Sequence, residues 1–259
     1  MARREGGAAR RPGHADRHTL IRATNDPELV RAEYADESRF AVRAAAWQNA
    51  AGARPREEAF RAVAEARPER VLEVGCGRGE LAARIAAELG SNVVAVDQSE
   101  RMVELARAAG VDARVGDVQE LPFEDDAFDC AVAAWMLYHV PDVDRALSEL
   151  ARVLRPGGRL VAVTNSERNL PELWGRFGSR SRREHAFSAE NAEEQLRRHF
   201  PHVERRDANG VVTFDDWEAA NAYVSASVTR RDLAGKLPRF EGPLACSLLV
   251  SVFVAERAA

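Results

Sequence analysis

The sequence predicts an α/β fold in which helices cover both faces of a mainly parallel sheet. Short apolar runs typical of buried parallel strands alternate with helical patterns over residues 70–165. The first of these runs ends in a glycine-rich turn that leads directly into a helix, and this segment reads VLEVGCGRGE from Val71 to Glu80. The chain closes with an alternating apolar segment, Ser247 to Glu256, which predicts a final strand.

Composition sets broad limits on function. The chain has 259 residues, a size compatible with one elaborated domain, and its formal net charge of −4 gives no overall electrostatic case for a nucleic-acid partner. Its three cysteines, Cys76, Cys130 and Cys246, are far apart and odd in number, which argues against a disulfide framework or a zinc site. No apolar run is long enough to cross a membrane. We therefore expect a cytoplasmic protein without a metal.

The N-terminal region divides into two parts. Residues 1–22 are rich in arginine, glycine and alanine without helical periodicity, so we expect a disordered basic tail. Residues 23–52 turn helical, with Asp26 as a cap and Pro27 in the first turn, and predict an N-terminal helical cap. A further helix over residues 55–66 leads into the first strand of the main domain, residues 53–259.

The glycine turn suggests a nucleotide-like ligand. Gly75, Gly77 and Gly79 alternate, so the backbone can approach a ligand closely, and the helix that follows offers free N–H groups. The dinucleotide fingerprint is G-x-G-x-x-G, whereas here the third glycine comes one residue earlier. An acidic residue, Glu73, also lies two positions before the first glycine.

The next strands place carboxylates at their tips. Residues 92–96 predict a strand that ends at Asp97, about 20 residues beyond the glycines, where a carboxylate can hold a ribose diol. Asp97 could instead cap the next helix, but Ser99 already offers that cap. Val111, Ala113 and Val115 alternate into a third strand before residues 116–119, GDVQ, where Asp117 could make a ligand contact or simply a turn.

Residues 129–134 predict a fourth strand, which is apolar after Asp129 and leads into a loop that begins at Trp135. A helix is expected over residues 144–154, and the sequence LRPGG at Leu154 to Gly158 predicts the turn into a fifth strand, residues 160–164. Beyond it we expect helices near 171–177, 188–199 and 215–228, with a strand at 203–207 that continues through 211–214.

The glycine run with Glu73, the acids at the strand tips and the LRPGG turn together resemble the class I S-adenosylmethionine-dependent methyltransferases, in particular the "type 11" methyltransferase-domain family. The resemblance implies a Rossmann-like seven-stranded sheet of order 3-2-1-4-5-7-6, with lid insertions near 166–200 and 215–246. It implies S-adenosylmethionine as cofactor, Asp97 as the ribose ligand and Asp117 as the acceptor for the adenine amino group. The cofactor-binding residues implied in this way are Glu73, Gly75, Cys76, Gly77, Gly79, Asp97, Gln98, Met102, Asp117, Val118, Gln119 and Ala134.

Methyl transfer is an in-line displacement for which the protein mainly positions the reactants, so no universal catalytic residue is required. His139, in the loop after the fourth strand, is the candidate general base, and a backbone-bonded loop histidine is the alternative. Tyr34 and Arg43 of the cap could reach the methionine end of the cofactor, or simply be packed and solvated. Candidate acceptor contacts are Trp135 and Tyr138 in the loop and Trp174, Arg176 and Arg180 in the insertion, whose arginines could bind an anionic group or be solvated surface.

The expected function is therefore methyl transfer to O, N or C of a small-molecule acceptor. An O-methyltransferase for an acyl-carrier-bound carboxylate and a non-catalytic cofactor-binding protein stay open as alternatives. A dehydrogenase is disfavoured by the glycine spacing and the LRPGG turn. A nucleic-acid methyltransferase is disfavoured because Ala134-Trp135-Met136 stands where an Asn-Pro-Pro-Tyr-like sequence would be expected.

Overall fold

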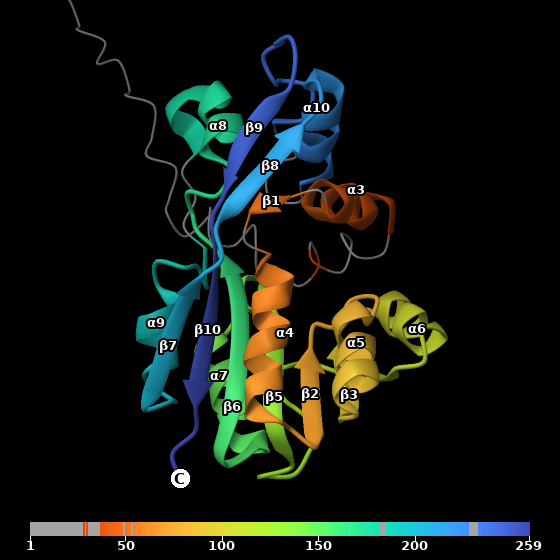
Figure 1. Cartoon of the computed structure of the whole chain (residues 1–259), viewed down its shortest axis with the longest axis vertical. Helices are drawn as coiled ribbons and strands as arrows, with labels where there is room; N and C mark the ends of the chain where they lie inside the picture. Colours follow the sequence, from red (N-terminus) through yellow and green to blue (C-terminus); the bar gives the residue numbers. More distant parts are fainter. Residues whose placement is uncertain are drawn as a thin grey trace, which may run out of the picture.

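The structure is a computed structural model that describes residues 28, 30, 37–48, 50–52, 54–181, 185–227 and 233–259. The predicted basic tail, residues 1–22, and Tyr34 lie outside the described residues. Figure 1 shows a lower part built around one large sheet and an upper part with a smaller sheet and several helices. We call the upper part the cap; it consists of α3, α8, α10 and the strands β1, β8 and β9.

The main sheet has seven strands in the order β4-β3-β2-β5-β6-β10-β7. The first five are parallel, and β10 is antiparallel to both of its neighbours. Numbered along the chain within this sheet, the order is 3-2-1-4-5-7-6, so the predicted fold class and strand order are confirmed. The strands are β2 (Arg70–Val74), β3 (Asn92–Asp97), β4 (Asp112–Val115), β5 (Phe128–Ala134), β6 (Leu154–Asn165), β7 (His202–Asp207) and β10 (Val250–Glu256).

Helices cover both faces of this sheet. In the central strand β5, Cys130 and Val132 pack toward one hydrophobic cluster, and Ala131 and Ala133 pack toward the other. This explains why the strand sequence from Cys130 to Ala134 is apolar without alternation. The first cluster contains α4 (Pro55–Ala66), α5 (Glu80–Leu89) and α6 (Glu100–Ala108), and the second contains α7 (Val143–Val153) and α9 (Ala192–Leu196).

The cap rests on the end of the main sheet to which the parallel strands point (Figure 1). Its three-stranded sheet has the order β1-β8-β9, and α3 packs against α10 with the rings of Trp47 and Tyr223 6.4 Å apart. The cap elements are α3 (Glu37–Gln48), β1 (Ala51–Gly52), α8 (Pro171–Trp174) with the 3-10 turn η2 (Gly175–Ser181), β8 (Gly210–Phe214), α10 (Trp217–Ala226) and β9 (Leu244–Leu248).

Two expectations for the C-terminal strands are wrong. The strand predicted to continue from 203 through 214 is two strands in different sheets, and the final strand predicted from Ser247 is interrupted at Leu249. At the break, Leu249 N–H donates to Asn169 Oδ1 (2.8 Å) and Val250 N–H donates to Asn209 Oδ1 (3.2 Å). These side-chain acceptors satisfy backbone groups that would otherwise need a sheet partner, so the chain can change sheets here.

Three smaller differences concern boundaries. The helix expected over 171–177 becomes a 3-10 turn after Trp174, and the one expected over 188–199 is helical only from Ala192 to Leu196. The LRPGG turn lies within the first residues of β6, where Gly157 has a φ of +72°. Within the described residues, no helix is both long and apolar enough to span a lipid bilayer.

Candidate active site

The glycine turn connects β2 to α5, and all three glycines have left-handed backbone conformations, with φ of +66° at Gly75, +54° at Gly77 and +75° at Gly79. A Cβ on Gly75 would lie 2.6 Å from the Cβ of Met136, and a Cβ on Gly79 would lie 2.9 Å from the Cβ of Ala106. Two of the glycines are therefore required by the packing of the protein on itself, whereas the sequence interpretation assigned all three to the approach of a ligand.

Asp97, at the tip of β3, ties the glycine turn to the neighbouring strand. Its Oδ2 accepts from the N–H of Gly77 and its Oδ1 accepts from the N–H of Ser99, both at 2.9 Å. Burial raises the pKa of Asp97 above its ordinary value, while the hydrogen bonds from Ser99 and Gly77 lower it. Ser99 itself caps α6 by accepting from Met102 N–H at 3.3 Å, so Asp97 is not the helix cap.

A cavity of about 800 Å³ lies between the cap and the ends of the parallel strands, where ligands of open α/β sheets bind. Its volume is within the range of about 300–1,000 Å³ that is usual for small-molecule sites. The structure brings most of the predicted residues to its wall. These are Glu73, Gly75, Cys76, Gly77, Asp97, Gln98, Asp117, Val118, Gln119, Ala134, Trp135, Tyr138 and His139.

The remaining predicted residues do not line the cavity. Gly79 packs against α6, and Met102 is fully buried on that helix. Trp174 is buried in the cap with its ring 6.3 Å from that of Tyr223, and the guanidinium of Arg176 lies 4.3 Å from the centre of the Phe240 ring. The side chain of Arg180 lies outside what the structure describes.

Glu73 is the most unusual ionisable group of the wall. Its side chain is only 4% exposed, and its Oε2 has no hydrogen-bond partner. Burial raises the pKa of this carboxyl to about 8, and the nearby charge of Asp97 acts in the same direction. A buried carboxyl oxygen without a partner, at the wall of a cavity, suits a positively charged group of a ligand, because such a charge would favour the ionised form of the carboxyl.

The sequence interpretation missed the cap wall of the cavity, apart from Arg43. No motif marks Trp47 of α3 or Tyr223 of α10 as a cavity residue, and neither was predicted to be one. Asn165, at the end of β6, was also missed. The side chains on this side are Arg43, Ala44 and Trp47 from α3, Tyr223 from α10, Leu248 from β9, and Asn165.

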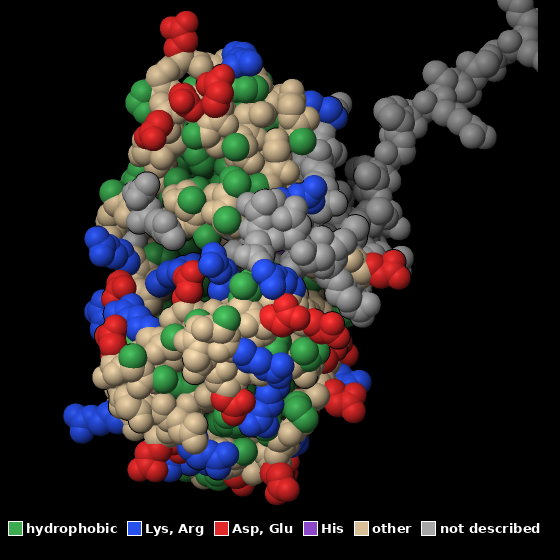
Figure 2. All heavy atoms as spheres, turned by 90° about the vertical axis from the view of Figure 1, so that its right-hand side faces the viewer, with side chains coloured by type: hydrophobic (Ala, Val, Ile, Leu, Met, Phe, Trp, Pro, Cys, Tyr) green, Lys and Arg blue, Asp and Glu red, His purple; other side chains and the backbone are tan. Residues whose placement is uncertain are grey.

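The rim of the cavity carries paired charges from α4 and α5. Arg56 pairs with Glu80 at 2.7 Å, and Arg84 binds both carboxylate oxygens of Glu57 at 2.7 and 2.9 Å. In Figure 2, Lys and Arg side chains lie along the lower border of the hollow below the cap, and hydrophobic side chains are visible inside it. These four side chains thus form two ion pairs at the rim, and the acidic groups Glu73, Asp97 and Asp117 lie on the sheet side.

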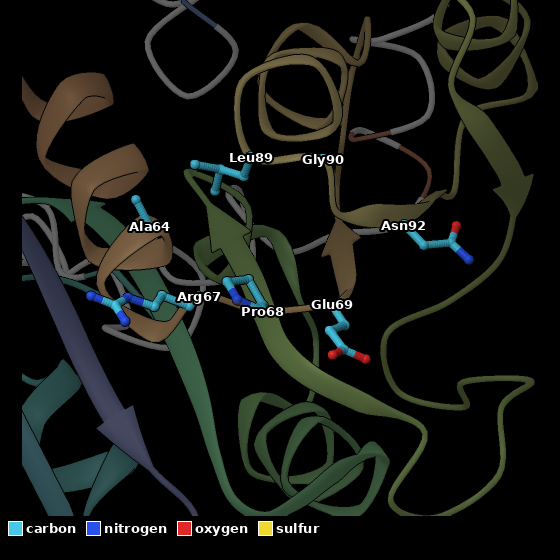
Figure 3. A pocket seen from close by; sticks show the side chains of 7 residues that line it. All are labelled: Ala64, Arg67, Pro68, Glu69, Leu89, Gly90 and Asn92. Carbon is cyan, nitrogen blue, oxygen red and sulfur yellow. The ribbon is translucent and has the colours of Figure 1, made fainter.

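A second, smaller cavity of about 390 Å³ lies at the opposite end of the parallel strands, where β2 and β3 begin (Figure 3). It is lined by residues before β2 and around the start of β3, such as Arg67, Glu69 and Asn92, and by none of the predicted site residues. Because ligands of parallel sheets bind beyond the carboxyl ends of the strands, we take the large cavity as the candidate active site. In the part of the chain that the structure describes, no group of three or more His, Cys, Asp and Glu side chains could hold a metal ion.

Comparisons with known proteins agree with this geometry. Residues 72–162 match the family model described as "Methyltransferase domain". The chain is 36% identical over 150 residues to "Methyltransferase GfsG" of Streptomyces halstedii, a match that covers 52% of this chain and 52% of that protein. It is 43% identical over 117 residues to a demethylmenaquinone methyltransferase of Clavibacter sepedonicus, covering 43% of this chain and 47% of the relative. The chain thus spans about half the length of these curated relatives.

One solved structure covers nearly the whole chain. The 1,6-didemethyltoxoflavin-N1-methyltransferase of Burkholderia thailandensis, solved with 1,6-didemethyltoxoflavin and S-adenosylhomocysteine, superimposes with a TM-score of 0.56 at 22% identity. The match covers 97% of this chain and 95% of that one, so the likeness in fold extends beyond the glycine turn and the main sheet to the cap.

Proposed function

We propose that this chain, whose residues 72–162 match a methyltransferase-domain family model, is an S-adenosylmethionine-dependent enzyme that transfers a methyl group to O, N or C of a small-molecule acceptor. The observation that carries the proposal is the shared cavity. The glycine turn, the strand-tip carboxylates Asp97 and Asp117, and the loop that begins at Trp135 all line one space beside the cap.

The residues present fit the cofactor. Asp97 would hold the ribose hydroxyls, and Asp117 with Gln119 would receive the adenine. Glu73 offers a buried carboxyl oxygen without a partner, which suits the α-ammonium group, whose positive charge would favour ionisation of the carboxyl. When bound, S-adenosylmethionine supplies a methyl group activated on a sulfonium.

The contribution of the chain to the reaction is positioning. The cavity walls would exclude water and hold the nucleophilic atom of the acceptor in line with the methyl carbon, an arrangement worth about 7–11 kcal/mol in favourable cases. For an O–H or N–H acceptor, His139 on the 3-10 turn η1 (Leu137–His139) would take the released proton, because it lines the same cavity.

The similar proteins support a small molecule as acceptor. The names of the Clavibacter relative and the Burkholderia structure refer to demethylmenaquinone and 1,6-didemethyltoxoflavin, which are both small molecules. The net charge of −4 favours no nucleic-acid partner. Cys76, Cys130 and Cys246 are free and buried, which suits a reducing compartment such as the cytoplasm.

Binding and turnover can be tested separately. Calorimetry with S-adenosylmethionine and S-adenosylhomocysteine should give one site per chain without added metal, and NAD should not bind. Formation of S-adenosylhomocysteine should then be followed with a panel of small O–H, N–H and activated C–H acceptors. Binding of NAD in place of S-adenosylmethionine would overturn the proposal.

A further inference from the structure

We propose that the acceptor side of this cavity is built for a planar, unsaturated ring system, received between Trp135 on the sheet side and Trp47 and Tyr223 on the cap side. The inference rests on the proposed function and adds the chemical class of the acceptor. It comes from three segments far apart in sequence, the loop after β5 and the helices α3 and α10, which bring aromatic rings to one cavity.

Trp135 is held in an unusual way. Its φ is +55°, a left-handed conformation that bulky residues rarely adopt and that tends to occur at functional sites. Two hydrogen bonds fix it there: its backbone N–H donates to Val163 O at 2.9 Å, and its indole Nε1–H donates to Asn165 Oδ1 at 3.2 Å. The only polar atom of the indole is thereby satisfied, and the half-buried ring offers apolar surface to the cavity.

The opposite wall is also aromatic and is braced from behind. Trp47 and Tyr223 meet edge to face, with their ring planes at 65°. The Tyr223 ring lies 5.3 Å from that of Phe214 on β8, so it is supported by the small sheet. Leu248 and Ala44 extend the same wall with apolar side chains. A flat ligand ring would therefore find aromatic surface on both sides.

Charges on the acceptor side favour a neutral or anionic ring over a cationic amine. Among the described lining residues from α3, α10, β9 and the ends of β5 and β6, none carries a carboxylate. Arg43 brings one positive charge to this wall, and its Nη1 donates to Ala226 O at 2.7 Å, which links α3 to the end of α10. Asn165 also brings a polar side chain to this wall, and its Oδ1 accepts from the Trp135 indole N–H.

The test uses two probes of the same skeleton, naphthol and its fully saturated counterpart decahydronaphthol. Each is titrated by calorimetry into protein saturated with S-adenosylhomocysteine. Naphthol should bind about tenfold more tightly, as expected where an aromatic ring gains contacts with more than one aromatic partner. Trp135→Leu and Trp47→Leu should each weaken naphthol binding about 3- to 10-fold and leave decahydronaphthol binding nearly unchanged. Trp135→Phe should retain most of the preference.

Trp217→Leu is the matched control, because Trp217 donates to Leu237 O at 3.0 Å and does not line the cavity. Retained S-adenosylhomocysteine affinity in each variant shows that the cofactor side is intact. Failure of the wild-type protein to bind S-adenosylhomocysteine would instead count against the proposed function. Equal affinities for the two probes, with cofactor binding present, would overturn the planar subsite. If Trp135→Leu fails to fold, Trp47→Leu carries the same comparison.

Discussion

Replacing Glu73 by glutamine should remove a pH dependence of stability that the wild-type protein shows between about pH 4.5 and 8. The folded protein keeps a proton on this buried carboxyl up to a pKa of about 8, whereas the unfolded chain releases it near 4.5. The folded state therefore binds more protons over this interval, so the free energy of unfolding falls as the pH rises. The slope from this one group approaches about 1.4 kcal/mol per pH unit.

Burial and several neighbouring groups together set the pKa of Glu73. Burial is the main cause of the raised pKa; Asp97 and Glu80 add to it, and the Ala82 backbone hydrogen bond and Arg56 oppose it. Urea unfolding at pH 5.5 and 7.5 should show wild-type protein losing about 2–3 kcal/mol relative to Glu73→Gln across those two units. Comparing how the free energy of unfolding changes with pH in the two proteins removes any pH-independent effect of the substitution on stability.

Glu80→Gln is the control, because Glu80 lines the same cavity but is exposed and paired with Arg56. Above pH 5.5, the free energy of unfolding of Glu80→Gln should change with pH in the same way as that of the wild-type protein. Parallel pH profiles for wild type and Glu73→Gln would refute the reasoning, since they would mean that Glu73 is already ionised in the folded protein.

Three further predictions concern the cofactor, the stability of the glycine turn and the chemistry. Asp97→Ala should weaken S-adenosylhomocysteine binding by about 1.5–3 kcal/mol in calorimetry, because a charged hydrogen-bond acceptor is lost, while the fold survives. Gly75→Ala should cost more stability in urea than Gly90→Ala, by about 1–3 kcal/mol: both glycines have positive φ, but only a Cβ on Gly75 meets another side chain. His139→Ala should lower kcat about 100-fold or more and flatten the acid limb of the pH profile, with little change in the KM of the acceptor.

Each of these has a contrary outcome. Full cofactor affinity in folded Asp97→Ala would move the ribose site elsewhere. Equal losses in Gly75→Ala and Gly90→Ala would mean that the loop at Met136 yields to the added methyl group. An unchanged pH profile in His139→Ala would leave this histidine a structural loop residue and the proton to solvent.

The main sheet and the cofactor side of the cavity could be predicted because their signals are local. An apolar strand, a glycine turn and a carboxylate at a strand tip lie within a few residues of one another, and parallel topology then brings the tips together at one edge. Glu73, Gly77 and Asp97 were found in this way, and all three line the cavity.

The acceptor side of the cavity could not be predicted from such local sequence signals. Helical periodicity indicates that Trp47, Met102, Trp174 and Tyr223 face something apolar, but it does not distinguish a closed core from the wall of a cavity. Met102 and Trp174 are in the core, whereas Trp47 and Tyr223 line the cavity. The change of sheet near Leu249 depends on Asn169 and Asn209, which are distant in sequence, so no local pattern announces it.

The broken C-terminal strands have a consequence for how such a protein can diversify. Asp207 pairs with Ser251 in the main sheet, and Gly210 pairs with Leu248 in the small one, so the chain leaves the core and returns to it at neighbouring positions. Residues 210–248, which supply Tyr223 and Leu248 to the cavity, thus leave the main sheet and return to it with their two ends paired in the small sheet. Neither β2, which carries Glu73, nor β3, which carries Asp97, pairs with this segment, so a change in its length leaves the pairing of those strands in place.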